Sequence, residues 1–343
     1  MSLFATAKAG QEAESAERFF SAAASFLERL DGFMEQQKDE FEPELRELVG
    51  YALAHSGKRL RPIAMYLAGV SAGGEVKDEI VRAAAVVEMV HLATLVHDDI
   101  LDDADLRHKQ ETVSKRYGVS AAVLLGDALF AQALQLASGF ETTEVCRLVS
   151  EATRKICAGE IEQTLDGEAP DDEIRRYFRI IERKTAVLFE VSCRLGALLG
   201  APGEQRADTA GKFGLHVGIA YQIYDDLVDV IGSEAVIGKT LGTDFTSGKR
   251  TLPFLLLSMD LKVIERQLFL EELDGKTATP QKIDLQKSIN QFGIVDRVGE
   301  FFASEIGEAK SAASSLAADG FGEGLVELAS FIEKRFAVLV REA

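Results

Sequence analysis

The chain has 343 residues, of which 47% are hydrophobic, which is enough to bury one large core. Its formal net charge of −18 argues against a nucleic-acid partner, because a phosphate backbone needs a basic surface. Only 6 prolines occur, and no linker rich in proline, glycine and serine divides the chain, so we expect one domain over residues 1–343.

The cysteines and the N-terminal segment indicate a reducing compartment. Cys146, Cys157 and Cys193 have neither the spacing of metal ligands nor that of a disulfide framework, so we expect free thiols. The first 18 residues contain three glutamates and no continuous apolar run, unlike a signal peptide. We therefore expect a cytoplasmic protein.

Apolar residues recur at spacings of three and four along most of the chain, and strand-like alternation is scarce, which predicts an all-α fold. The expected helices cover residues 11–35, 41–55, 62–72, 78–103, 111–117, 119–138, 142–166, 171–200, 204–232, 250–272, 280–291, 293–318 and 321–341. The first lies in an N-terminal helical segment, residues 1–40. Residues 232–249, rich in glycine and lysine, are predicted to form a mobile lid, although an ordinary surface loop has a similar composition.

The longest apolar stretch, about residues 83–101, is predicted to be a buried core helix. Glu88, His91 and Thr94 interrupt it, and it ends in aspartates, so it is unlike a membrane span.

Two aspartate clusters of identical spacing follow long apolar helical stretches. They read Asp98-Asp99-Ile100-Leu101-Asp102 and Asp225-Asp226-Leu227-Val228-Asp229. Residues four apart share a helix face, and like charges placed in this way repel each other unless a cation lies between them. Carboxylate oxygens are the ligands that Mg²⁺ prefers when it also bridges to a phosphate. If the clusters face each other, they would hold several Mg²⁺ ions around one diphosphate.

A solvated acidic surface is the competing interpretation of these clusters. A single copy of so short a motif would favour that interpretation, because it occurs often by chance. Two copies, each at the end of an apolar helix, favour a metal site.

Further short motifs surround both clusters. They are Ser56-Gly57-Lys58-Arg59-Leu60-Arg61-Pro62, residues 88–97, Leu106-Arg107-His108-Lys109, Lys184-Thr185-Ala186, Tyr221-Gln222, residues 238–244 and Gly248-Lys249-Arg250-Thr251-Leu252-Pro253. In the order and spacing of these motifs the chain resembles the trans-type polyprenyl diphosphate synthases, with an octaprenyl-like, long-chain branch expected. The resemblance implies a single-domain helical bundle of the isoprenoid synthase type with a central active-site cavity. It also implies condensation of isopentenyl diphosphate with an allylic diphosphate.

The resemblance implies roles for the acidic and basic residues of these motifs. The principal Mg²⁺ ligands would be Asp98, Asp102 and Asp225, while Asp99, Asp226 and Asp229 would bind through water or support the ligands. The allylic diphosphate would be held by Arg107, Lys184 and Lys239, and Lys249 is a further candidate for closing over it. Isopentenyl diphosphate would be held by Lys58, Arg61 and His91.

The allylic cation needs a partial negative charge that does not react with it. The amide oxygen of Gln222 and the hydroxyl of Thr185 have this property, although Gln222 by position alone could equally be an ordinary polar helix residue. No side chain is suited to remove the final proton, so we expect the departing diphosphate to accept it. Alternative interpretations stay open for the basic turn at Lys58 and Arg61 and for His91, which on an apolar helix is often only a core residue.

One motif departs from the family pattern. Where the family shows Arg-Arg-Gly, this chain has Arg107-His108-Lys109. The second arginine normally belongs to the isopentenyl diphosphate site, so protonated His108 or Lys109 is expected to replace it, with weaker binding.

Two other classes of protein compete with a synthase. An isoprenoid cyclase would need Ser and Glu where Asp229 and Ser233 stand. A non-catalytic subunit of a heteromeric synthase would be expected to lose aspartates, and this chain keeps all of them. A homodimer is expected, with a transient membrane contact for product release.

Product length is predicted from the residues before the first cluster. A chain growing away from the metals along this helix would meet Thr94 and Ala93, then Val90. Because these side chains are small, we expect a product longer than C20, about C30 to C40, with a geranylgeranyl or farnesyl product as the alternative. Leu124 and Leu125 on the neighbouring helix are candidates for a deeper limit. Ala93 and Thr94 could instead be small only because two helices pack closely there.

Overall fold

The computed structural model describes the backbone of residues 10–54, 57–70, 77–107, 110–165, 173–201, 203–233, 241–275, 285–318 and 320–342, and side chains from residue 23 onward. Its helices in the first half are α1 (Gly10–Gln37), η1 (Lys38–Glu40), α2 (Arg46–Ala54), α3 (Leu60–Gly69), α4 (Asp78–Leu101), α5 (Val113–Tyr117), α6 (Val119–Ser138) and α7 (Glu144–Thr164). The second half contains α8 (Glu173–Ile181), η2 (Glu182–Ala186), α9 (Val187–Gly200), α10 (Glu204–Ile231), α12 (Thr243–Thr246), α13 (Leu252–Asp260), α14 (Val263–Leu273), α15 (Leu285–Gln291), α16 (Ile294–Ala318) and α17 (Glu323–Glu342). The fold is all-α, as predicted.

Several expected helices differ from the structure. The expected helix 41–55 begins only at Arg46, as α2. The expected helix 111–117 begins later, because β1 (Leu106–Arg107) pairs antiparallel with β2 (Gln110–Glu111) before it. The expected helix 171–200 contains a π-helical turn, η2. The expected helix 250–272 is two helices, because Leu261 and Lys262 have extended backbones and the backbone N–H of Lys262 donates to the Glu265 carboxylate. Apolar periodicity continues through each interruption, so it does not mark these breaks.

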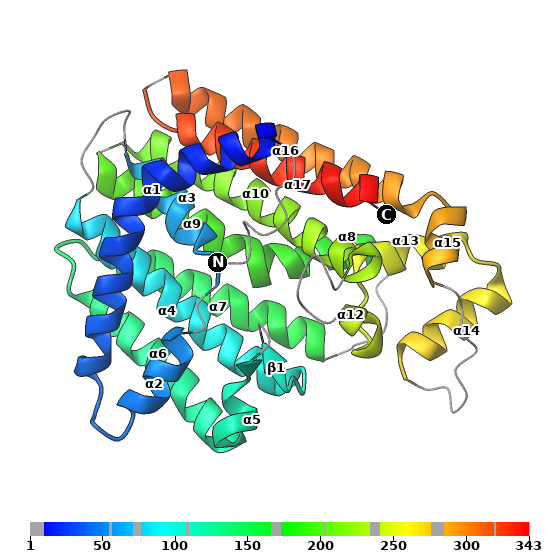
Figure 1. The fold of residues 1–343 in the computed structure, drawn as a ribbon, viewed down its shortest axis with the longest axis horizontal. Coiled ribbons are helices and arrows are strands. Elements are labelled where there is room, and N and C mark those ends of the chain that lie inside the picture. The colour runs from blue at the N-terminus through cyan, green and yellow to red at the C-terminus, as the bar shows by residue number, and fades with distance from the viewer. Residues whose placement is uncertain are drawn as a thin grey trace.

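The buried side chains form two clusters that meet at α9. One cluster is shared mainly by α3, α10, α13, α16 and α17, and the other by α1, α4, α6 and α7. Phe189 and Cys193 of α9 belong to the first cluster, whereas Leu188 and Val191 belong to the second. Helix α9 thus contributes side chains to both clusters and joins the two halves of the molecule. In Figure 1, α9 and α10 run through the middle, with α16 and α17 on one side and α4, α7 and α6 on the other.

Helices α3 and α9 are in backbone contact because glycines lie where they cross. A Cβ placed on Gly196 would lie 2.0 Å from the carbonyl oxygen of Met65, and one on Gly200 would lie 2.0 Å from that of Gly69. Neither position has room for any side chain unless a backbone moves. The crossing fixes the start of α3, which carries the Lys58–Arg61 motif.

Among the described residues, two helices are apolar and long enough to cross a membrane by composition, namely α4 and α6. In α4, 72% of the most apolar window is buried inside the protein, which agrees with the expected core helix. In α6 only 33% of that window is buried, so this helix presents apolar side chains outward.

We predict that Gly196→Ala destabilises the protein by about 3 kcal/mol, because the new methyl group must displace the α3 backbone. The control is Gly307→Ala on α16, where no atom lies within 4 Å of the added Cβ. In that control the free energy of unfolding should rise by up to about 1 kcal/mol, because alanine has a higher helix propensity than glycine. Urea unfolding of both variants measures the difference, and equal free energies of unfolding would contradict the close α3–α9 crossing.

Candidate active site

Both aspartate clusters lie at the C-terminal ends of buried helices. Asp98 and Asp99 are in the last turn of α4, and Asp102 caps it. Asp225, Asp226 and Asp229 lie in the last two turns of α10. The carbonyl end of a helix carries a partial negative charge, so carboxylates there are unfavourable unless cations compensate for them.

Lysines provide that compensation at the first cluster. The ammonium of Lys249 donates to Oδ2 of Asp102 at 2.8 Å. The Lys184 ammonium forms an ion pair with Glu160 and lies 3.8 Å from Oδ2 of Asp98. Burial raises the pKa of Asp98 to about 6, and the charges of Glu160 and Asp102 act in the same direction while Lys184 opposes them. The cluster thus has more negative charge than its lysines neutralise.

The donor set at this cluster fits Mg²⁺ better than a softer metal. Carboxylate oxygens are hard ligands, and Mg²⁺ usually takes only one or two of them and completes its shell with water and phosphate oxygens. In the part of the chain that the structure describes, no three His, Cys, Asp or Glu side chains lie close enough together to hold a metal ion. Asp98, Asp102 and Asp225 therefore do not form a complete ligand set by themselves, and substrate phosphate and water oxygens would have to complete the shell of an Mg²⁺ ion bound there.

Lys249 also connects the first cluster to the second. Its ammonium lies 3.9 Å from Oδ1 of Asp244, and the backbone N–H of Asp244 donates to Oδ2 of Asp229 at 3.0 Å. The hydroxyl of Thr243 donates to the other oxygen of Asp229 at 3.1 Å. Asp229 is thus engaged in holding the second half of the expected lid. Residues 234–240 of that lid, with Lys239, lie outside the described residues.

The π-helical turn η2 places Lys184 and Thr185 between the clusters. Two glycines allow this: a Cβ on Gly159 of α7 would lie 3.1 Å from the backbone nitrogen of Lys184, and one on Gly218 of α10 would lie 2.7 Å from Cα of Ala186. Such π turns occur often at functional sites because they redirect side chains within a helix.

A chain of hydrogen bonds runs from Thr185 into the second cluster. The hydroxyl of Thr185 donates to Oε1 of Gln222 at 2.8 Å, and Nε2 of Gln222 donates to Oδ1 of Asp226 at 2.7 Å. The hydroxyl of Tyr177 donates to Oδ2 of Asp226 at 2.6 Å. Burial raises the pKa of Asp226 well above its usual range, and it likewise raises the pKa of Tyr177, which remains a donor.

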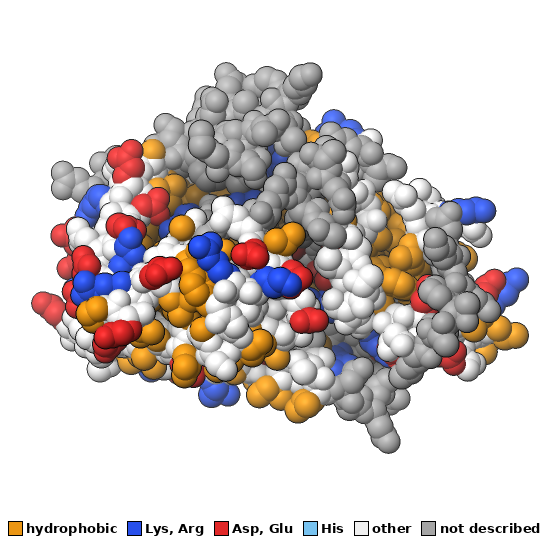
Figure 2. Space-filling view, turned by 60° about the horizontal axis from the view of Figure 1, so that its bottom comes forward, with side chains coloured by type: hydrophobic (Ala, Val, Ile, Leu, Met, Phe, Trp, Pro, Cys, Tyr) orange, Lys and Arg blue, Asp and Glu red, His pale blue; other side chains and the backbone are white. Residues whose placement is uncertain are grey.

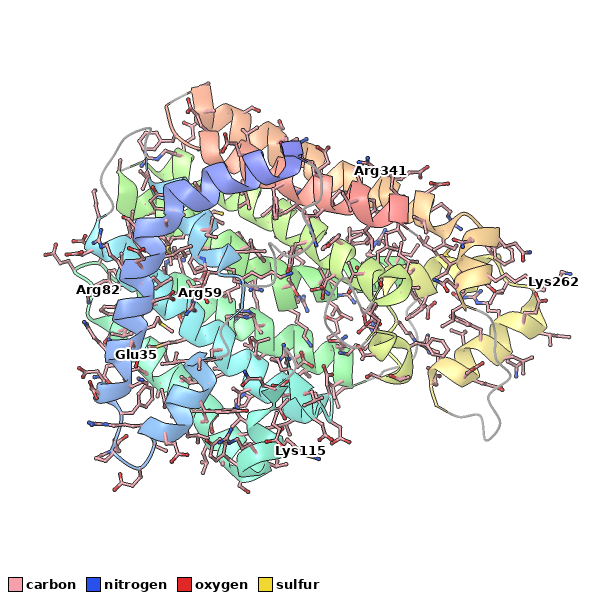
Figure 3. The ribbon with its side chains drawn as sticks, viewed as in Figure 1. Glu35, Arg59, Arg82, Lys115, Lys262 and Arg341 are labelled. Carbon is pink, nitrogen blue, oxygen red and sulfur yellow. The ribbon has the colours of Figure 1, made fainter. Side chains whose placement is uncertain are left out.

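The basic motif at the start of α3 lies against α4. Arg59 has a left-handed backbone with φ of 54°, and its guanidinium pairs with the buried Glu88 at 2.5 Å and with Asp31 at 3.0 Å. It thereby ties the motif to both α4 and α1 (Figure 3). Lys58 is exposed at the mouth of a cavity of about 20 Å³ that also contacts Tyr221 and Arg335.

Arg61 and His91 are brought together, as expected for one anion site. Nη1 of Arg61 lies 3.0 Å from Nε2 of His91, and its guanidinium stacks 4.6 Å above the ring of Phe189. Burial, together with the charges of Arg61, Arg107 and Arg59, holds the pKa of His91 well below its usual range. His91 is therefore neutral and accepts a hydrogen bond from Arg61.

Arg107 binds the first cluster in the structure. Its Nε and Nη2 contact Oδ1 of Asp99 at 2.9 and 2.8 Å. Contact of Arg107 with a diphosphate stays a prediction, and His108 and Lys109 lie outside the described residues.

The predicted chain-length residues are near the metal cluster but do not line the cavity described there. Val90 and Ala93 are buried, and the Thr94 hydroxyl donates to the carbonyl of His91 at 2.7 Å. A cavity of about 30 Å³ beside Asp99 is lined instead by Leu92, Leu95 and Val96 from the same helix. Of the two candidates on α6, Leu125 is buried, whereas Leu124 is 65% exposed and so does not limit a cavity within one subunit.

Sequence reasoning missed four residues of this site. They are Tyr177, Glu88, Glu160 and Asp244, which support the predicted residues and were given no role. A charged residue on an otherwise apolar helix was the available signal for Glu88. Nothing in the sequence places Tyr177 opposite Asp226.

The sequence model of the family described as polyprenyl synthetase matches residues 42–290. The chain belongs to this family. It is 34% identical over 275 residues to heptaprenyl diphosphate synthase component 2 of Bacillus subtilis, covering 77% of this chain and 79% of that protein. It is 32% identical over 279 residues to geranylgeranyl diphosphate synthase of Methanosarcina mazei, covering 78% and 82%.

The fold is that of the family's solved structures. A polyprenyl synthase from Caulobacter crescentus, crystallised with calcium and isoprenyl diphosphate, superimposes with a TM-score of 0.81 at 28% identity. The superposition covers 92% of this chain and 96% of that one. The predicted isoprenoid synthase fold and the predicted family are thus confirmed.

Proposed function

We propose that this polyprenyl synthetase condenses isopentenyl diphosphate with an allylic diphosphate in an Mg²⁺-dependent reaction, yielding an all-trans polyprenyl diphosphate. The observation that carries the proposal is the position of Lys249. It binds Asp102 of the first cluster and approaches Asp244, which is bound to Asp229 of the second. Two acidic clusters more than a hundred residues apart in sequence are therefore linked through Lys249 and Asp244.

The clusters would hold the metal and the leaving group. Asp98, Asp102 and Asp225 would bind Mg²⁺, which when bound stabilises the charge that develops on the departing diphosphate. Lys184, Lys239 and Arg107 would neutralise the remaining diphosphate oxygens, with Lys249 turning from Asp102 towards the substrate. Asp99, Asp226 and Asp229 would support these groups without binding metal directly.

Breaking the allylic C–O bond leaves a cation that must survive until it is captured. The Gln222 oxygen, which accepts from Thr185, faces it with a partial negative charge and forms no bond to it. Lys58, Arg61 and His91 bind the diphosphate of the isopentenyl substrate, with His108 or Lys109 as a further contact. The double bond of this substrate then attacks the cation. Loss of a proton to the released diphosphate then restores a double bond.

The supporting comparison for a metal comes from the Caulobacter protein, which was crystallised with calcium. Support for a heteromeric alternative comes from the Bacillus relative, which is named as a component. Because all six aspartates are present, we favour a catalytic chain over a non-catalytic subunit. We also propose that the protein is cytoplasmic and touches membranes only transiently when product leaves.

For product length we favour more than C20, about C30 to C40, because Ala93 and Thr94 are small. The alternative is a geranylgeranyl or farnesyl product, and relatives with heptaprenyl and geranylgeranyl names have similar identity to this chain.

We further propose a homodimer formed through α6. The exposed apolar side chains on this helix are Val119, Val123, Leu124 and Leu134, at 56, 40, 65 and 44% exposure. Figure 2 looks towards the side of the molecule on which α6 lies and shows hydrophobic side chains spread across it. Contiguous apolar surface of this kind commonly marks a protein interface, and a two-fold interface is the commonest arrangement.

The first prediction of this proposal concerns activity. Purified protein with Mg²⁺, isopentenyl diphosphate and allylic primers should release diphosphate and form longer prenyl chains. Asp98→Asn should lower turnover by at least about 100-fold, because one ligand is lost from the metal that stabilises the leaving group. Asp127→Asn, an exposed carboxylate on α6, is the control and should keep wild-type turnover. Equal turnover in the two variants would refute the metal role of Asp98.

The second prediction concerns product length. Thr94→Phe and Ala93→Phe should shorten the product towards about C15 to C20, because an aromatic ring blocks the space along α4. Primer ionisation should persist, since neither side chain is a candidate metal ligand. Sizing of products by chromatography tests this, and an unchanged distribution in both variants would show that the chain grows along another face.

The third prediction concerns assembly. Sedimentation equilibrium should give a dimer at micromolar concentration, and Leu124→Lys should shift it towards monomer because it buries a charge in an apolar interface. Val263→Lys changes an equally apolar side chain that is 84% exposed on α14, and it should leave the dimer intact. A wild-type monomer would rule out the proposed dimer.

A further inference from the structure

We propose that Arg59 and Glu88 are positioning residues of the isopentenyl diphosphate site. Their ion pair holds a left-handed turn at residue 59, and this turn places Lys58 for the diphosphate. Arg59 itself would not bind substrate. The inference rests on the proposed function, because it concerns how one substrate of that reaction is bound.

The backbone of Arg59 has an unfavourable conformation. Its φ is 54°, in the left-handed region where an L side chain crowds the following carbonyl oxygen. Among the described residues, Arg59 and Asp103 are the two that have a positive φ without being glycine. Strain of this kind persists only where surrounding contacts hold it, and it gathers at functional sites. The contacts that hold residue 59 are therefore informative.

Two carboxylates from different helices hold this turn. Nη1 of Arg59 donates to Oε2 of Glu88 on α4 at 2.5 Å, and Nη2 donates to Oδ1 of Asp31 on α1 at 3.0 Å. The side chains of Arg59 and Glu88 are 12% and 5% exposed, whereas that of Asp31 is 62% exposed. Water screens a buried pair less than an exposed one, so Glu88 is the stronger anchor.

The same face of α4 holds another basic residue of the motif. His91 is three positions after Glu88, so their side chains lie on one face of the helix. Nε2 of His91 lies 3.0 Å from Nη1 of Arg61, which belongs to the first turn of α3. Lys58, by contrast, precedes the helix. Arg59 is thus the junction between a basic residue fixed in α3 and one that is not.

The value of φ at residue 59 decides where Lys58 lies. A change from 54° to about −60°, the ordinary helical value, would rotate the preceding peptide about the N–Cα bond of Arg59. Lys58 lies at the mouth of the cavity that Tyr221 and Arg335 also line. The rotation would carry its ammonium away from there, while Arg61 would keep its place in α3. The two cations would then no longer converge on one diphosphate.

Arg59 is itself a poor candidate for binding substrate, although it lies between two residues that are good ones. Its guanidinium is already occupied by two carboxylates. By contrast, Nε of Arg61 is buried and has no hydrogen-bond partner among the described residues. Three cations within four positions repel one another, and neutralising the middle one reduces that repulsion.

The first test is Glu88→Gln, which keeps the size of the side chain but removes the charge that holds Arg59. The Michaelis constant for isopentenyl diphosphate should rise about tenfold or more, and so should its dissociation constant, measured by calorimetry with Mg²⁺ and no primer. The Michaelis constant for the allylic primer should change less than about threefold. Glu305→Gln removes a carboxylate from another pair between helices, with His216, and is the control that should leave all three constants unchanged.

Glycine provides a second test that depends on the backbone alone. Because glycine adopts a positive φ as readily as a negative one, Glu88→Gln combined with Arg59→Gly should recover both isopentenyl diphosphate constants to within about threefold of wild type. Glu88→Gln combined with Arg59→Ala is the matched control, since alanine also lacks the ion pair but keeps the strain, and it should stay about tenfold impaired. A purely structural role would change the folded fraction and hence turnover, but not a Michaelis constant, which is independent of enzyme concentration.

The outcomes separate this inference from the proposed function. Wild-type protein that neither condenses the substrates nor binds isopentenyl diphosphate overturns both. If wild type binds isopentenyl diphosphate without condensing it, only the function falls, and the calorimetric constants still decide the positioning role.

Unchanged constants in Glu88→Gln overturn the positioning role alone, as do equal constants in the glycine and alanine double variants. A rise in Glu88→Gln that glycine reverses and alanine does not reverse supports the role. Should Glu88→Gln fail to fold, the difference between the two double variants decides it.

Discussion

Repulsion among buried carboxylates at two helix ends is the constraint on which the rest of this structure depends. Asp98 and Asp99 end α4, and the second cluster ends α10, where the helix dipole already disfavours negative charge. Their neighbours are consequently selected as donors: Arg107 for Asp99, Lys249 for Asp102, and amide, phenol and backbone donors for Asp226 and Asp229. Burial raises the pKa of Asp98 to about 6, and the charges of Glu160 and Asp102 act in the same direction. A divalent cation would relieve the repulsion that remains.

Close packing of helix backbones against one another supports this arrangement of charged groups. Lys184 and Thr185 reach both clusters only because η2 lies directly on α7 and α10, and glycines at 159 and 218 leave the space for it. The α3–α9 crossing uses the same device at Gly196, and it sets the position of Arg61 over Phe189 of α9. Close contacts between backbones resist deformation, so the charged groups are held by a rigid frame.

The sequence was sufficient for the family, the all-α fold, the two clusters and the pairing of Arg61 with His91. These depend on short motifs and on helical periodicity, which a single sequence displays. The π turn at residues 182–186 was not predictable, because it keeps the apolar spacing of an uninterrupted helix. Tyr177 was missed for a related reason: its hydroxyl meets a carboxylate 49 positions away, and that meeting depends on the angle between α8 and α10. Leu124 was misplaced because apolar character does not distinguish a core face from an exposed one.

Under the proposed function, helix α4 would also organise the two substrates relative to each other. Glu88 and His91 hold the basic groups of the α3 motif, while Asp98 and Asp102 gather charge for the metal at the end of the same helix. With a rise of 1.5 Å per residue, His91 and Asp98 lie about 10 Å apart along the axis. The basic site and the acidic site, held at this spacing on one helix, would keep the two diphosphates far enough apart to weaken their repulsion. The isopentenyl group would still lie within reach of the allylic carbon. Because neutral His91 accepts from Arg61 without adding charge of its own, it would hold this guanidinium in a fixed position for an isopentenyl diphosphate.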